Sequence, residues 1–131
     1  MKYVMVILIM SFLLPTLVSG SSEKMINIYY IPIGAETYVP ITVENIEANY
    51  VRYGNFKINN PNLKKLFDLI RDTESEVGTF DGEIVRVKII FPDEKILYID
   101  NNGGVKSHPS EKIGNVRKNL KKIRSILETI L

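Results

Sequence analysis

The chain contains no cysteine, so no disulfide can hold its fold together. A domain without disulfides has to be stabilised by burying apolar side chains. Residues 21–131 are long enough for one such core, because a chain of about 110 residues buries roughly 65% of its unfolded surface on folding. The lack of cysteine also excludes a thiol nucleophile and a lipid-bearing cysteine. We therefore expect a single self-sufficient domain over residues 21–131.

Residues 1–20 have the pattern of an export signal. Lys2 supplies a positive charge, residues 3–14 are apolar except for Ser11, and Pro15 follows this run. Small residues up to Gly20 favour cleavage between residues 20 and 21. An apolar run of about a dozen residues is shorter than the roughly 20 that span a bilayer, although an uncleaved anchor is the alternative. The sequence predicts a periplasmic or secreted protein that meets the membrane only through this segment.

Composition narrows the class of partner. Without Lys2, the chain has 16 basic and 15 acidic residues, so nucleic acid is not an expected partner. An exported chain without cysteine favours a bacterial source, because small secreted eukaryotic domains usually depend on disulfides. The charges are nevertheless segregated along the chain. Acidic residues gather in residues 72–83, and basic residues gather in residues 112–124.

Alternating apolar residues predict several strands. In the first of these, residues 25–33, Ile26, Ile28 and Tyr30 share one face. Two further extended segments are expected at residues 37–41 and 50–58, with Thr42 as the N-cap of a short helix between them. A meander of three antiparallel strands is expected over residues 84–91, 96–100 and 105–106, joined by turns rich in Pro, Asn and Gly. In the strand over residues 84–91, Arg86 and Lys88 are assigned to the polar face.

Helical periodicity appears twice. Asn60 and Pro61 form a strong helix start, and apolar residues at spacings of three and four follow, which predicts a helix over residues 61–73. From about residue 110 the same spacing runs to the end of the chain and predicts a helix over residues 110–131. The expected architecture is an α+β fold, in which these two helices cover one face of an antiparallel sheet.

Catalytic and metal-binding motifs are weak. His108 is the single histidine, and no Gly-x-Ser-x-Gly motif accompanies it, so we interpret it as a surface residue. An EF-hand count from Asp72 places Val77 where glycine is required, so calcium is not expected. Asp81 and Glu83 are the best available pair for a carboxylate-dependent hydrolase of envelope polymers. Such a pair requires a cleft, but these two carboxylates fall in an apparent turn where water keeps both ionised. The sequence therefore favours a protein that is not an enzyme and holds no cofactor.

Tyrosine is concentrated in the N-terminal third of the domain. Exposed tyrosine is enriched at protein interfaces, and acidic loops complement basic clefts, so we predict binding to another exported or envelope protein. An inhibitor or immunity-type protein of the bacterial envelope is one such class. A structural envelope subunit that dimerises through residues 110–131 is a further alternative. The residues expected at the contact are Tyr29, Tyr38, Tyr50, Tyr53, Glu74, Glu76, Asp81 and Glu83.

Overall fold

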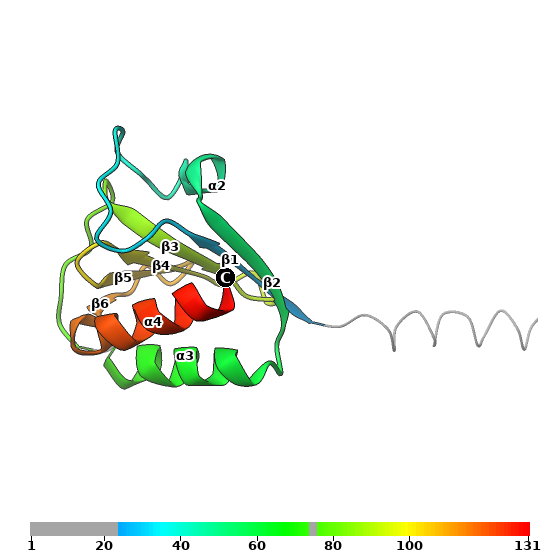
Figure 1. The fold of residues 1–131 in the computed structure, drawn as a ribbon. Helices are drawn as coiled ribbons and strands as arrows, with labels where there is room; N and C mark the ends of the chain where they lie inside the picture. Colours follow the sequence, from blue (N-terminus) through cyan, green and yellow to red (C-terminus); the bar gives the residue numbers. More distant parts are fainter. Residues whose placement is uncertain (1–23, 74–75) are drawn as a thin grey trace, which may run out of the picture.

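The computed structural model describes residues 24–73 and 76–131, so the expected signal segment, residues 1–20, lies outside the described residues (Figure 1). In chain order the elements are β1 (Met25–Tyr30), α2 (Ile46–Asn49), β2 (Arg52–Lys57), α3 (Pro61–Thr73), β3 (Val85–Ile90), β4 (Ile96–Asp100), β5 (Gly104–His108), β6 (Ile113–Asn115), the 3₁₀ turn η1 (Arg117–Asn119) and α4 (Leu120–Ile130).

The strands form one six-stranded sheet in the order β2-β1-β3-β4-β5-β6, and each neighbouring pair is antiparallel. Strands β3 to β6 are adjacent in the order in which they occur along the chain. The α+β class expected from the sequence is confirmed. Among the elements described, no helix is both long enough and apolar enough to cross a membrane.

Helices α3 and α4 lie side by side under the sheet (Figure 1). Their buried side chains share one apolar cluster with the strands, and fully burying a side chain such as Leu or Ile contributes about 1.5–3 kcal/mol. The alternation predicted for β1 is confirmed, since Ile26, Ile28 and Tyr30 are fully buried in this cluster. From the helices the cluster contains Leu63, Leu66, Ile70, Ile123 and Leu127.

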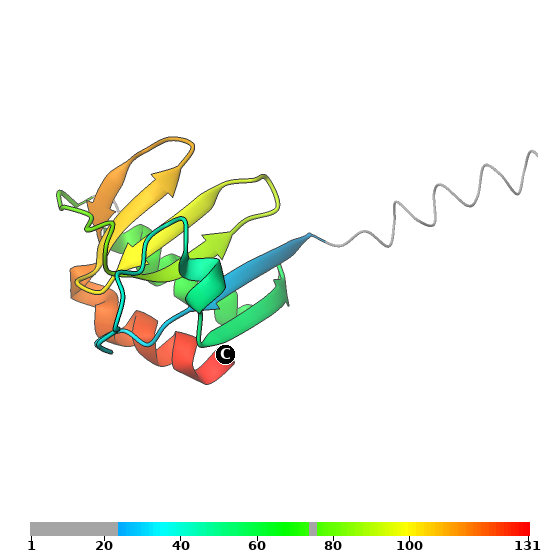
Figure 2. The ribbon, with the colours of Figure 1, turned by 90° about the horizontal axis from the view of Figure 1, so that it is seen from above.

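A second, smaller cluster partly covers the opposite face of the sheet. The segment between β1 and β2 runs over this face, and α2 lies above the strands in Figure 1 and in front of them in Figure 2. Ile41 and Ile46 from this segment are buried together with Val85 and Tyr98 from the sheet. The two faces of the sheet are therefore covered unequally.

The predicted helix over residues 61–73 has the same bounds as α3. Asn60 caps it, because its side-chain oxygen accepts a hydrogen bond from the backbone N–H of Asn62 at 2.9 Å. Pro61 occupies the first helical position, where a missing N–H costs no bond.

The predicted helix over residues 110–131 is wrong over its first ten residues. Ile113–Asn115 form strand β6, in which Gly114 pairs with Val105 of β5, and η1 precedes α4. Ile113 has the helical spacing of the later apolar residues but is 52% exposed. The backbone pairing with β5 therefore overrides a periodicity that continues by chance into the strand.

Two expectations between β1 and β2 are also wrong. Residues 37–41 form no strand, and Ile41 contributes an isolated parallel bridge to Ile84. Thr42 is not a helix N-cap, because α2 begins at Ile46 and the side chain of Asn45 accepts a hydrogen bond from the backbone N–H of Thr42.

Arg86 was expected on the solvated face of its strand, and this expectation is wrong. A register shift between Val85 and Val87 marks a bulge in β3, and Arg86 is 3% exposed. Its guanidinium donates hydrogen bonds to the carbonyls of Val85 and Ala35, both at 3.0 Å. Burial lowers the pKa of Arg86, and the charge of Asp100 opposes this shift. Val85 and Val87 consequently pack in the two different clusters.

Asp100 organises the turn after β4. It is 2% exposed, and one carboxylate oxygen accepts hydrogen bonds from the backbone N–H groups of Asn102 and Gly104, both at 2.8 Å. The other oxygen accepts a bond from the N–H of Asp81 at 2.8 Å. A Cβ at Gly104 would clash with that carboxylate and with the backbone carbonyl of Thr79, so the close approach requires glycine. Asp100 thus joins the loop before β3 to the β4–β5 turn.

We predict that Asp100→Asn lowers the free energy of unfolding by about 3 kcal/mol, because the new amide group has to face a buried N–H donor. Urea denaturation measures the change. The matched control is Asp93→Asn, since Asp93 also accepts a backbone N–H, from Lys95, but its side chain is 59% exposed. Equal and small losses for the two variants would show that the Asp100 network does not stabilise the fold.

Candidate functional site

Three of the four predicted tyrosines meet on the sheet face opposite α3 and α4. In the antiparallel pairing of β1 with β2, Tyr29 lies directly opposite Tyr53, and Ile28 and Tyr30 point into the core below the sheet. Tyr50 directly precedes the extended segment that becomes β2. Residues directly opposite one another in an antiparallel pair share a face, which explains why Tyr29 and Tyr53 come together.

The three rings contact one another. Their centroids lie 5.2 Å apart for Tyr29 and Tyr50, 4.9 Å for Tyr29 and Tyr53, and 6.0 Å for Tyr50 and Tyr53. These separations fall within the range of favourable edge-to-face and tilted aromatic pairs. Tyr50 is 44% and Tyr53 is 43% exposed. We call Tyr29, Tyr50 and Tyr53 the tyrosine surface.

Polar contacts lie within and beside the tyrosine surface. The Tyr53 hydroxyl donates a hydrogen bond to the side-chain oxygen of Asn27 at 2.5 Å, and Asn55 donates to the same oxygen at 2.6 Å. At the border of the surface, Lys88 forms a 3.1 Å ion pair with Glu47. Lys88 lies opposite Tyr29 in the pairing of β1 with β3. The Tyr53 ring is thus held both by its neighbouring rings and by a hydrogen bond to β1.

Burial raises the pKa of the Tyr29 phenol, and the negative charge of Glu47 raises it further. The raised pKa means that the folded state favours the neutral phenol. The resulting contribution to stability is present below the unfolded pKa of about 10 and is lost as the pH rises through the folded value. At neutral pH this member of the surface is therefore an uncharged hydrogen-bonding group.

The other predicted contact residues do not join the tyrosine surface. Tyr38 lies in the loop after β1, is fully exposed and does not contact the three clustered rings. Glu74 lies outside the described residues. The carboxylate of Glu76 forms a 2.9 Å ion pair with Lys118, which neutralises one charge of the acidic loop.

Asp81 and Glu83 lie on an exposed turn before β3. A side-chain oxygen of Asp81 accepts a hydrogen bond from the backbone N–H of Glu83 at 2.9 Å, so the carboxylate closes a local turn. Neither residue lines the cavity described next. The Asp81 carboxylate therefore stabilises the backbone of its own turn, and the pair does not lie in an enclosed site.

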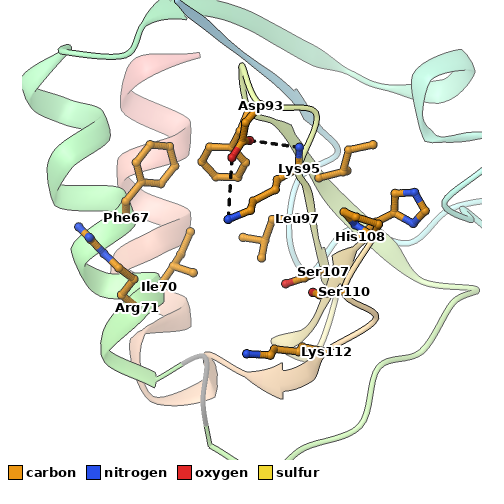
Figure 3. A pocket seen from close by; sticks show the side chains of 13 residues that line it. Phe67, Ile70, Arg71, Asp93, Lys95, Leu97, Ser107, His108, Ser110 and Lys112 are labelled. Carbon is orange, nitrogen blue, oxygen red and sulfur yellow. Dashed lines mark hydrogen bonds and ion pairs between the residues drawn. The ribbon is translucent and has the colours of Figure 1, made fainter.

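A cavity of about 670 Å³ opens between α3 and the ends of strands β4 and β5 (Figure 3). Sequence reasoning did not anticipate it, because its walls come from segments far apart along the chain. Phe67, Ile70 and Leu97 form apolar walls, and Lys95 and Lys112 bring basic groups. The apolar stripe predicted for residues 61–73 supplies one wall of the cavity, but such a stripe indicates core packing equally well.

His108, at the end of β5, has an exposed side chain. In Figure 3 its ring points away from α3, and its Nδ1 lies 3.3 Å from a carboxylate oxygen of Glu111. Residues 24–73 and 76–131 contain no group of three or more His, Asp or Glu side chains that could hold a metal ion. The described residues therefore provide two candidate binding sites, the tyrosine surface and the cavity.

We predict that Glu47→Gln lowers the pKa of Tyr29, because it removes a nearby negative charge and leaves the ring in place. NMR titration of ¹³C-labelled tyrosine measures this pKa. Glu44→Gln is the control, since it removes a carboxylate that does not act on Tyr29. An unchanged Tyr29 pKa in Glu47→Gln would contradict the proximity of the two groups.

Comparison with known proteins gives no relative of this chain: no family model, no curated protein and no solved structure matches it.

Proposed function

We propose that this chain is an exported, non-enzymatic protein-binding module whose contact is centred on the tyrosine surface. The observation that carries the proposal is the packing of three tyrosine rings on a sheet face with Tyr50 and Tyr53 more than two-fifths exposed. An inhibitor or immunity-type protein of the bacterial envelope is the class of binding protein that we favour.

Preorganisation of the three rings favours binding at the tyrosine surface. A tyrosine side chain supplies a large contact area while few rotatable bonds have to be fixed on binding. Here the rings already contact one another, and the Tyr53 hydroxyl is already hydrogen-bonded to Asn27. Binding then costs less side-chain entropy than ordering isolated surface residues would. Tyrosine is also among the residues that most often dominate the energy of protein interfaces.

Neighbouring groups extend the contact. Val51, between Tyr50 and β2, is 63% exposed and adds apolar area. The Lys88–Glu47 ion pair adds charges of both signs at the border. An apolar and aromatic centre with a polar border is the usual composition of a protein interface. The charged border favours a partner of mixed charge over a uniformly basic one.

The acidic loop has a smaller place in this proposal than the tyrosines. Lys118 already compensates Glu76, and Asp81 is engaged with the backbone of its own turn. Charges that are paired within the protein steer a partner less than free charges do. Glu76 also bridges to Asn115 of β6, at the edge of the sheet opposite β2, so we place this residue outside the contact centred on the tyrosine surface.

The structural-subunit alternative requires α4 to offer an apolar face to a second chain. Ile123 and Leu127 are fully buried against the sheet of the same chain, so that face is already occupied. The hydrolase alternative requires two carboxylates that converge in a cleft, and Asp81 and Glu83 lie on an exposed turn. No specific observation favours either of these two functions.

We predict that Tyr50→Ser combined with Tyr53→Ser abolishes capture of a partner that the unmodified protein binds in stoichiometric amount. Each central aromatic contact contributes about 2 kcal/mol at such positions, which is roughly 30-fold in affinity, so losing both weakens binding by up to roughly 1,000-fold. The measurement is affinity capture from the native host with light crosslinking, followed by quantitative mass spectrometry.

The matched control is Tyr38→Ser, which removes a fully exposed tyrosine outside the tyrosine surface. Each variant is first checked for an unchanged thermal unfolding midpoint. Loss of the partner in the double variant and retention in the control would support the proposal. Equal capture by all three proteins, or no partner above background for the unmodified protein, would overturn it.

A further inference from the structure

The cavity beside α3 lies on the helix-covered side of the sheet, and the tyrosine surface lies on the other side. In the pairing of β4 with β5, Leu97 lies opposite Ser107, and Leu97 belongs to the core cluster beneath the sheet. Phe67 and Ile70 of α3 face these strands across the opening (Figure 3). A ligand in the cavity would therefore leave the tyrosine surface free.

The inner part of the cavity is apolar and continuous with the core. Ile70 is 3% and Leu97 is 6% exposed, and both belong to the core cluster. The rings of Phe67 and Phe91 pack at 5.3 Å between centroids and close one side. The volume of about 670 Å³ lies within the range of roughly 300–1,000 Å³ typical of small-molecule sites. Such an interior favours an aliphatic or aromatic body.

Polar groups gather at the mouth of the cavity, and most of the charged ones are cationic. The side chains of Lys95 and Lys112 extend toward the space between α3 and the strands, where the hydroxyls of Ser107 and Ser110 also lie (Figure 3). Arg71 stands on the helix side of the mouth. Basic groups beside hydroxyl donors are suited to an anionic oxygen.

Carboxylates of the protein compensate some of these cations but leave one uncompensated. A carboxylate oxygen of Asp93, the acidic residue in the lining, lies 3.8 Å from the Lys95 ammonium. A carboxylate oxygen of Asp68 forms an ion pair with the Arg71 guanidinium at 2.7 Å. For Lys112, no carboxylate in the part of the chain that the structure describes forms an ion pair. Glu111 is engaged by Lys106 at 3.0 Å and does not line the cavity. The mouth therefore has a cation available for a ligand.

We propose that this cavity binds a small amphipathic anion, namely a free fatty acid, with its acyl chain among Phe67, Phe91 and Leu97 and its carboxylate at Lys112. The apolar interior excludes fully polar ligands, because their buried groups would lack hydrogen-bond partners. The cationic mouth disfavours amphiphiles with a positive head group. The hydroxyls of Ser107 and Ser110 supply donors to the carboxylate beside the ammonium.

The test uses dodecanoate below its micelle concentration and measures binding by isothermal titration calorimetry on the purified protein. We expect one molecule per chain. Replacing Lys112 by methionine should weaken binding roughly tenfold or more, because it removes a charge-assisted bond and keeps the length of the side chain. Ser107→Phe, which fills the cavity from β5, should abolish binding. Thermal unfolding of each variant verifies that it is folded.

Lys121→Met is the control variant, since it removes one exposed lysine outside the cavity and should bind dodecanoate as the unmodified protein does. Dodecyltrimethylammonium is the control ligand, and it should bind at least tenfold more weakly. Equal affinity for the two amphiphiles, or equal affinity of the Lys112→Met and Lys121→Met variants, would overturn the proposal. So would the absence of dodecanoate binding, and capture of a peptide that ends in an apolar residue and a free carboxylate would then identify a different ligand for the cavity.

Discussion

Burial of α3 and α4 against one face of the sheet is the interaction on which the rest of the structure depends. With no disulfide available, the chain places its largest apolar cluster, with Ile28, Leu66 and Leu127 fully buried, between these helices and the strands. Both long helices of residues 24–73 and 76–131 lie on that face, so the four-residue helix α2 and irregular segments cover the other. The incomplete cover leaves room for the tyrosine surface over β1 and β2.

Features encoded by neighbouring residues could be predicted. The start of α3 depends on Asn60 and Pro61, and both act on backbone groups within the first turn. The faces of β1 follow from strict alternation, which places Tyr30 in the core and Tyr29 away from it. In each of these elements the tertiary environment favours the same structure as the local sequence does, so the prediction from the sequence agrees with the structure.

Features created by pairing between distant segments could not be predicted. Ile113 continues the helical spacing of α4, but its backbone pairs with β5. Arg86 is buried because a bulge in β3 turns it toward the carbonyl of Ala35, 51 residues earlier. The meeting of Tyr29 with Tyr53 required the register of β1 with β2. The cavity, with walls from α3, β4 and β5, likewise had no local signature.

The proposed contact of the tyrosine surface with a partner can be tested by tyrosine-selective chemical labelling. The protein in its native extract is compared with the purified protein through peptide mass spectrometry. We expect Tyr50 and Tyr53 to be protected in the extract, while the fully exposed Tyr38 is labelled equally in both samples. Equal labelling of Tyr38, Tyr50 and Tyr53 in the two samples would contradict it.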